Sequence, residues 1–180
     1  MYPDGNGTKL KEEIANHENA AFENIIICNG SNEILELAAR AFLNPDASSI
    51  ASKHAFAVYK IVTQSSGASL IEVPTCNWGH DLKSFDDYLE NNTRVIFIAN
   101  PNNPTGTYNS HEEVYSLLKK VPSSVLVVLD CAYFEYVTKE DYVKPIDLLN
   151  EFDNLLITKS FSKIHGLASI RVGYGIASPS

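Results

Sequence analysis

The chain has 180 residues, 44% of them hydrophobic and 20% charged, which is typical of a globular protein with one sizeable core. Its formal net charge of −8, with no run of Lys or Arg, argues against a protein that mainly binds nucleic acid. No apolar stretch approaches the ~20 residues of a membrane-spanning helix, and the amino-terminus lacks the basic and apolar regions of a signal peptide.

Short apolar segments and amphipathic segments alternate along the chain. The apolar segments, rich in β-branched residues, are predicted strands at 25–28, 69–73, 95–99, 125–129, 155–158 and 172–176. The amphipathic segments are predicted helices at 8–17, 33–42, 84–90 and 111–119. Most predicted strands are apolar on both faces, as in strands that helices cover on each side. The alternation predicts an α/β fold of three layers, with a mostly parallel sheet between two layers of helices.

In such sheets ligands bind where the strands end at their carboxyl edge. After 25–28, a Gly30-Ser31 turn leads into a helix whose first backbone N–H groups could bind an anion. An ordinary helix N-cap is the alternative. After 95–99, segment 100–106 contains two prolines and three asparagines. Such a rigid loop could aim an Asn amide at a ligand, or could simply turn the chain.

A carboxylate follows the next predicted strand. Asp130 comes directly after the apolar run 125–129, where partial desolvation requires a cationic partner or hydrogen bonds. A ligand site and a structural salt bridge are both compatible with this position.

Two lysines follow the strand predicted at 155–158. A lysine at a strand end in the same cleft could act as a nucleophilic amine. Lys159 is expected to be a solvated surface residue. Lys163 is the stronger candidate, because Ser160, Ser162 and Arg171 supply phosphate-binding groups close by in the sequence. An anion site, an Asn amide, a carboxylate and an amine together match the requirements of pyridoxal 5′-phosphate (PLP).

The motifs resemble those of the fold-type-I PLP-dependent aminotransferases, and among these the histidinol-phosphate aminotransferases. The resemblance covers essentially the whole chain and rests on the joint spacing of six motifs rather than on any one. In chain order they are Tyr2-Pro3-Asp4, Gly30-Ser31-Asn32-Glu33, Phe56-Ala57-Val58-Tyr59, Asn100 to Gly106, Asp130-x-Ala132-Tyr133, and Ser160-Phe161-Ser162-Lys163 with Arg171.

The resemblance implies catalytic roles for Lys163, Asp130 and Tyr133. Lys163 would hold PLP as a Schiff base and move the proton between the substrate α-carbon and the cofactor. Asp130 would pair with the pyridine N–H, Asn103 and Tyr133 would hydrogen-bond the phenolic oxygen, and Phe56 would stack on the ring.

The phosphate of PLP has its own implied set of residues. These are Ser31, Asn32, Ser160, Ser162 and Arg171. Tyr2 would reach the phosphate of a neighbouring subunit, which implies a homodimer with shared sites.

The resemblance also implies a reaction and a domain. The expected reaction transfers an amino group between histidinol phosphate and 2-oxoglutarate or glutamate, in histidine biosynthesis. An aromatic aminotransferase, a phosphothreonine-type decarboxylase and a truncated, non-catalytic PLP-binding module are the alternatives. Residues 1–180 are expected to be the PLP-binding large domain, without the N-terminal segment and C-terminal small domain of the family.

The histidines and cysteines carry no further chemistry in this interpretation. His17, His80 and His111 are expected to be solvated, whereas His54 and His165 flank the predicted site and could touch a ligand. No spacing suggests a metal site. Three widely spaced cysteines suit a reducing compartment, so a cytoplasmic location is expected, with neither nucleic acid nor membrane as a partner.

Overall fold

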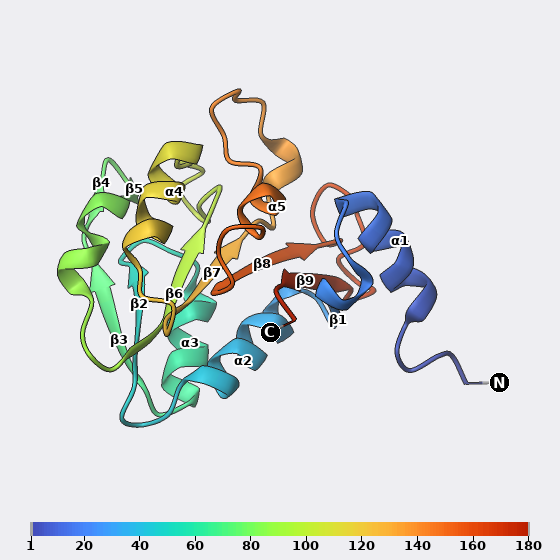
Figure 1. Ribbon diagram of the computed structural model, residues 1–180, viewed down its shortest axis with the longest axis horizontal. Coiled ribbons are helices and arrows are strands. Elements are labelled where there is room, and N and C mark those ends of the chain that lie inside the picture. Colours follow the sequence, from blue (N-terminus) through green and yellow to red (C-terminus); the bar gives the residue numbers. More distant parts are fainter. Residues whose placement is uncertain (1, 180) are drawn as a thin grey trace.

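A seven-stranded sheet forms the centre of the computed structural model, which describes residues 2–179 (Figure 1). The strand order is β1-β9-β8-β7-β6-β2-β3. The strands are β1 (Ile25–Cys28), β2 (Ser48–Ser52), β3 (Ser69–Val73), β6 (Thr93–Ala99), β7 (Leu126–Asp130), β8 (Leu155–Ser160) and β9 (Gly173–Ala177). Strands β3, β2, β6, β7 and β8 are parallel, whereas β9 pairs antiparallel with β8 and with β1. The sheet is therefore mixed but mostly parallel.

Helices cover both faces of this sheet (Figure 1). They are α1 (Thr8–Glu18), α2 (Ser31–Phe42), α3 (Ala57–Ser65), α4 (His111–Lys120), α5 (Pro145–Leu148) and three 3₁₀ helices, η1 (Phe22–Asn24), η2 (Leu82–Tyr88) and η3 (Phe134–Tyr136). Buried side chains of α2 and α3 belong to one core cluster, and those of α1, α4, α5 and η2 belong to another. The predicted three-layer α/β fold is confirmed.

Successive side chains of a strand contribute alternately to the two core clusters. In β6, Ile96 and Ile98 pack with the α1 and α4 side, whereas Val95 and Phe97 pack with the α2 and α3 side. Successive side chains of a strand point to opposite faces, so a strand covered on both sides must be apolar at every position. This explains the unbroken apolar runs in the sequence.

Local hydrogen bonds fix the start of helix α4. Helix α4 begins after Ser110, whose hydroxyl accepts the Glu113 backbone N–H at 3.4 Å while the Glu113 carboxylate accepts the Ser110 N–H at 3.0 Å. This capping box satisfies two backbone donors that a helix start leaves unpaired. The predicted helix over 84–90 is instead the 3₁₀ helix η2.

Strand β2 of the sheet and the helix that follows it, α3, escaped prediction. Strand β2 is Ser-Ser-Ile-Ala-Ser and fully buried. Its serines are satisfied by other side chains, as in the 2.7 Å hydrogen bond between the Ser49 and Thr63 hydroxyls. A central strand can therefore be polar in composition when the fold supplies partners.

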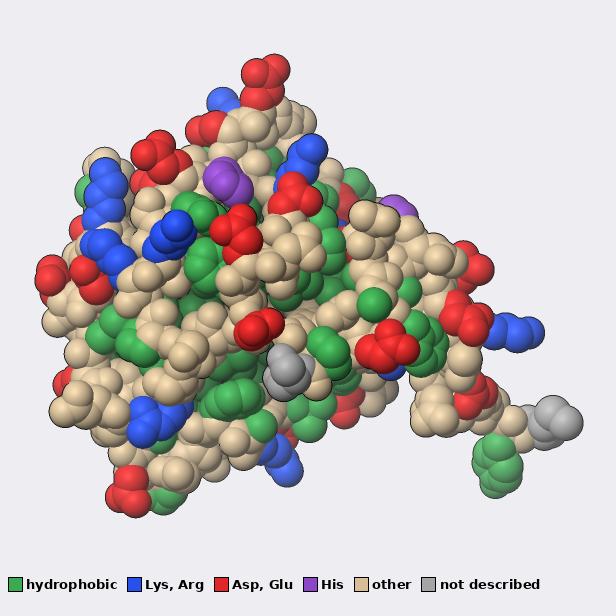
Figure 2. Space-filling model, in the orientation of Figure 1, with side chains coloured by type: hydrophobic (Ala, Val, Ile, Leu, Met, Phe, Trp, Pro, Cys, Tyr) green, Lys and Arg blue, Asp and Glu red, His purple; other side chains and the backbone are tan. Residues whose placement is uncertain are grey.

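The N-terminal arm projects from the body of the molecule (Figure 1, Figure 2). On the face seen in Figure 2, acidic and basic side chains are interspersed over the surface. Within residues 2–179, no helix is both long and apolar enough to cross a membrane.

Candidate functional site

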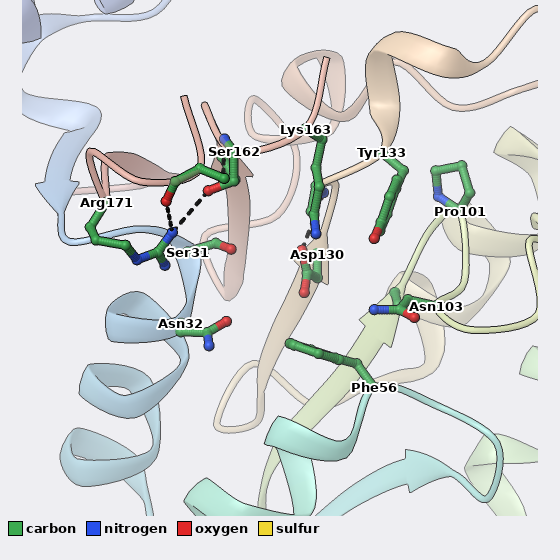
Figure 3. A pocket seen from close by; sticks show the side chains of 14 residues that line it. Ser31, Asn32, Phe56, Pro101, Asn103, Asp130, Tyr133, Ser162, Lys163 and Arg171 are labelled. Carbon is green, nitrogen blue, oxygen red and sulfur yellow. Dashed lines mark hydrogen bonds between the residues drawn. The ribbon is translucent and has the colours of Figure 1, made fainter. Parts of the chain in front are cut away.

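A cavity of about 220 Å³ lies at the carboxyl ends of β6, β7 and β8, beside the N-termini of α2 and α3 (Figure 3). Every predicted site residue except Tyr2 lines it, namely Ser31, Asn32, Phe56, Asn103, Asp130, Tyr133, Ser160, Ser162, Lys163 and Arg171. Tyr2 lies in the N-terminal arm and is 97% exposed. The topology thus brings together residues up to 140 positions apart in the sequence, from Ser31 to Arg171.

One end of the cavity is built to hold an anion. Helix α2 begins at Ser31, so the first N–H groups of the helix and its positive dipole end face this region. The Arg171 guanidinium lies here too, and its Nη1 donates to Ser162 Oγ at 3.1 Å and to the Ala168 carbonyl at 2.9 Å. A fixed guanidinium, serine hydroxyls and a helix N-terminus form a site for a phosphate.

Two glycines allow this close approach. Gly30 has φ +80°, and a Cβ there would overlap the Arg171 guanidinium. A Cβ on Gly173 would lie 2.5 Å from the Ser31 backbone nitrogen, nearer than side chains tolerate. Arg171 itself has φ +59°, an unusual conformation for a residue with a side chain. The backbone is therefore shaped around the cation that faces the anion site.

Asp130 lies at the floor of the cavity and is 5% exposed. The Tyr59 hydroxyl donates to its Oδ2 at 2.9 Å. Its Oδ1 accepts from the Thr158 hydroxyl at 3.1 Å and from the Ala132 N–H at 3.2 Å. No ion pair to Asp130 occurs among residues 2–179. Hydrogen bonds rather than a structural salt bridge thus hold this carboxylate.

Burial dominates the electrostatics of Asp130. Desolvation raises the pKa of the carboxyl above its ordinary value, although the three hydrogen bonds and the positive charge of Lys163 oppose this. A buried carboxylate with a raised pKa binds a proton, or a cationic N–H group, more readily than an exposed one does. The floor of the cavity is therefore suited to a protonated ring nitrogen.

The remaining side chains surround the space above Asp130. Figure 3 shows the Lys163 side chain extending toward Asp130, with Tyr133 beside it and Asn103 and Phe56 across the cavity. The Lys163 Nζ lies 5.0 Å from the centroid of the Tyr133 ring. An amine, a phenol, an amide and an aromatic face thus converge on one small volume.

This set of groups suits a planar, anionic, carbonyl-bearing ligand. The anion site would bind its charged end, Phe56 would stack on its ring, and Lys163 would attack its carbonyl as a nucleophilic amine. The model for "aminotransferase class I and II" matches residues 1–180 of the sequence. The chain belongs to this aminotransferase family.

Named relatives support the assignment. The chain is 51% identical, over 178 residues, to histidinol-phosphate aminotransferase 2 of Pseudomonas fluorescens, covering 99% of this chain and 48% of that protein. It superposes with a TM-score of 0.93 and 28% identity on histidinol-phosphate aminotransferase from Sinorhizobium meliloti in complex with pyridoxal-5′-phosphate, covering 99% of this chain and 49% of that one.

A second chemistry occurs on the same fold. L-threonine-O-3-phosphate decarboxylase from Porphyromonas gingivalis superposes with a TM-score of 0.83 and 25% identity, covering 99% of this chain and 52% of that one. The chain spans about half the length of the relatives that it matches.

Two of the sequence-based predictions are wrong. Lys159 is not a solvated surface residue but 5% exposed, and its Nζ pairs with Glu18 at 2.8 Å and with Glu135 at 3.4 Å. His80 is likewise buried, whereas His17 and His111 are exposed as predicted. His54 and His165 do not line the cavity. Among the residues described, no cluster of three or more His, Cys, Asp or Glu could hold a metal ion.

Sequence reasoning also missed two partners of Asp130. Tyr59 follows Phe56 by three residues, so one turn of α3 carries both toward the site, and its ring stacks on Phe97 at 5.0 Å. Thr158 is the register partner of Asp130 in the β7–β8 pair. The α-helical spacing from Phe56 was available as a signal for Tyr59, whereas Thr158 requires the strand register.

Proposed function

We propose that residues 1–180 are the PLP-binding large domain of an aminotransferase that exchanges an amino group between histidinol phosphate and 2-oxoglutarate or glutamate. The observation that carries the proposal is Asp130, a buried carboxylate without an ion-pair partner among residues 2–179, facing the same cavity as the Lys163 amine. Such a carboxylate needs a cation from the ligand, and a protonated pyridine nitrogen supplies one.

The residues present fit PLP at each of its polar groups. Ser31, Asn32, Ser160 and Ser162, with Arg171, would hold the phosphate, and Asp130 would hold the pyridine N–H. Asn103 and Tyr133 would hydrogen-bond the phenolic oxygen, Phe56 would cover the ring, and Lys163 would join the carbonyl carbon. The anion site at one end of the cavity and the Asp130 carboxylate at its floor, which has no ion pair among residues 2–179, support this orientation of the cofactor.

When bound, PLP would supply an electron sink for the charge left when the α-carbon of the substrate loses a proton. Lys163 is the base that takes this proton and the acid that returns it. Asp130 would keep the proton on the ring nitrogen, so that the ring could accept the negative charge that develops at the α-carbon. Tyr133 and Asn103 would hydrogen-bond the phenolic oxygen.

Binding and reaction need separate tests. PLP titrated into the purified chain should give the absorbance change of a lysine-bound cofactor, and Lys163→Ala should eliminate that change. An unaltered absorbance in Lys163→Ala would refute the assignment of Lys163. A chain without any PLP binding would refute the proposed function itself.

The substrate proposal rests on the 51% identity with a histidinol-phosphate aminotransferase. A panel of amino donors with 2-oxoglutarate, read out as glutamate formed by the protein that contains this chain, should rank histidinol phosphate first. Aromatic amino acids ranking first would favour an aromatic aminotransferase instead. PLP binding without any half-reaction would favour a non-catalytic PLP-binding module.

A decarboxylase is the second candidate, because a threonine-phosphate decarboxylase shares the fold with a TM-score of 0.83. The two reactions differ in the bond broken at the α-carbon, C–H in transfer and C–COO⁻ in decarboxylation. Release of CO₂ from phosphothreonine, measured beside glutamate formation from histidinol phosphate, separates them.

We further propose a cytoplasmic homodimer in which Tyr2 reaches the phosphate site of the neighbouring subunit. The nearly full exposure of Tyr2 on a projecting arm supports this role. Mixing Lys163→Ala chains with Tyr2→Ala chains should restore tight PLP binding in the mixed dimer, since one of its two sites has both residues. Absence of restoration in a verified mixed dimer would contradict the shared site.

A further inference from the structure

A small hairpin outside the main sheet contacts both loops that flank the cofactor cavity. It consists of β4 (Thr75–Cys76) and β5 (Gly79–His80). Thr75 Oγ1 lies 2.9 Å from Nδ1 of His54, and His54 precedes Phe56 by two residues. Gly79 faces the other loop, because a Cβ there would lie 3.3 Å from Thr107 Oγ1. The hairpin therefore touches the segment that leads to Phe56 and the loop that carries Asn103.

His80 joins the two strands from which these loops emerge. Its Nδ1 lies 2.7 Å from the Ser52 hydroxyl at the end of β2, and its Nε2 lies 2.8 Å from the Ala99 carbonyl at the end of β6. A carbonyl oxygen only accepts, so Nε2 carries the proton and Nδ1 accepts from Ser52. The ring is 5% exposed, and burial lowers the pKa of His80 below its ordinary value, which favours this neutral form.

The hydrogen bonds continue from His80 into the Asn103 loop. The His80 carbonyl accepts from the Asn109 side-chain amide at 3.1 Å. The Asn109 N–H donates to Asn100 Oδ1 at 2.9 Å, and Asn100 Nδ2 donates to the Asn109 carbonyl at 3.0 Å. Asn102 Nδ2 donates to the His54 carbonyl at 2.8 Å. The loop is thus tied to the hairpin at its far end and to the Phe56 segment at its middle.

We propose that His80 is a positioning residue: by bridging the carboxyl ends of β2 and β6, it fixes the separation of Phe56 and Asn103 across the cavity. The inference rests on the proposed function in one respect, since that separation matters for holding a PLP ring. His80 itself does not line the cavity, and it acts only through the two loops.

Three variants test this role. His80→Leu removes both side-chain hydrogen bonds at a similar volume, whereas His80→Gln keeps one donor for the Ala99 carbonyl and one acceptor for Ser52. His111→Leu is the matched control, because His111 is an exposed histidine on α4. PLP affinity should fall about tenfold in His80→Leu, as expected for a lost pair of buried hydrogen bonds. It should recover in His80→Gln and stay unchanged in His111→Leu.

Hydrogen exchange in the cofactor-free chain provides a readout independent of PLP. His80→Leu should accelerate exchange selectively in residues 52–56 and 100–109, with β7 and β8 unchanged. Equal acceleration everywhere would show a merely structural role and overturn the proposal, and so would unchanged loops. If His80→Leu does not fold, Ser52→Ala, which removes one hydroxyl, should give the same pattern at smaller amplitude. If the wild-type protein binds no PLP but His80→Leu still shows the selective acceleration, the proposed function is refuted and the loop-positioning role of His80 stands.

The ¹⁵N NMR chemical shifts of the His80 ring nitrogens show directly which of the two nitrogens carries the proton. We expect a protonated Nε2 and an unprotonated Nδ1 at neutral pH. A ring protonated on Nδ1 would overturn the bridge to the Ala99 carbonyl.

Discussion

Two lysines four positions apart at the end of β8 differ in almost every physical respect. Lys159 lies within the strand and is buried, paired with Glu18 and Glu135 and stacked 4.2 Å from the centroid of the Phe134 ring. Lys163 lies beyond the strand, is exposed, and has no ion pair within residues 2–179. Its side chain extends toward Asp130 (Figure 3).

Strand geometry explains the difference. Side chains of β8 alternate between faces, so Thr158 and Ser160 point to the Asp130 side while Lys159 points to the opposite side, among α1 and η3. A buried ammonium must be neutralised, and two carboxylates with a Tyr174 hydroxyl donating to Glu18 form its surroundings. Lys163 has no such ion-pair partner among residues 2–179 and lines the cavity instead. Burial with charged partners gives Lys159 a structural role, whereas Lys163 is the lysine that we propose to be reactive.

The largest expected effect is on the reactive lysine. Lys163→Ala should lower amino transfer at least about a thousandfold, because it removes both the nucleophile and the acid–base group. The free energy of unfolding should change by less than about 0.5 kcal/mol, as for other exposed side chains. Steady-state kinetics and urea unfolding of the same preparation check both statements. Substantial residual transfer, or a large loss of stability, would erase the contrast with Lys159.

The opposite pattern is expected for the structural lysine. Lys159→Met leaves two partly buried carboxylates without their cation and should destabilise the fold by about 3 kcal/mol. Folded protein should still bind PLP covalently. Lys120→Met is the control, since the 2.9 Å pair of Lys120 with Asp86 is solvent-exposed and should contribute less than about 1 kcal/mol. Equal losses of unfolding free energy in Lys159→Met and Lys120→Met, measured by urea unfolding, would contradict a stabilising role for the ion pairs of Lys159.

Asp130→Asn should separate function from stability. Amino transfer should fall about a hundredfold, because a neutral amide cannot hold the proton on the ring nitrogen. The turnover of the variant and of wild type, measured with saturating PLP, checks this.

Stability of the cofactor-free chain should move the other way. Folding raises the pKa of the Asp130 carboxyl. The folded chain therefore loses stability as the pH rises above the pKa that this carboxyl has in the unfolded chain, because ionisation costs more in the folded state. Asp130→Asn should therefore be more stable than wild type at neutral pH, with the gain vanishing below about pH 4. A gain that grows toward low pH would contradict a raised pKa.

The smallest effect concerns the anion site. Gly30→Ala forces the Arg171 guanidinium aside and should weaken PLP binding about tenfold, the loss of roughly 1.4 kcal/mol of phosphate interaction. Gly166→Ala is the matched control, because Gly166 also has a positive φ but has open space at its Cβ position. Inorganic phosphate should compete with PLP in wild type and less well in Gly30→Ala, as measured by fluorescence titration. Similar losses of PLP affinity in Gly30→Ala and Gly166→Ala would indicate backbone strain instead.

The sequence predicted the site better than it predicted the surroundings of the site. Strand ends of a parallel sheet lie at one edge, so residues after separate apolar runs could be expected to meet, and they line one cavity. Their roles toward PLP come from a family resemblance and remain predictions. Phosphate and amine chemistry is local in sequence, which is why Ser162, Lys163 and Arg171 could be recognised together.

Burial of polar residues depends on distant partners and was therefore invisible. Lys159 is neutralised by Glu18, 141 residues away, and the His80 ring is hydrogen-bonded by Ser52, 28 residues away. Strand β2 escaped for the same reason, since its serines find hydroxyl partners on α3 and β6 rather than an apolar pattern. Local periodicity predicts where apolar side chains go, but the fold decides which polar ones can be buried.

The central claim, that Lys163 and not Lys159 is the reactive amine, has one direct measurement. Borohydride reduction of the PLP-loaded chain fixes the cofactor to the lysine that carries it, and mass spectrometry of the digested protein locates the adduct. We expect a phosphopyridoxyl group on Lys163 and an unmodified Lys159. An adduct on Lys159, or labelling spread over the surface lysines, would contradict it.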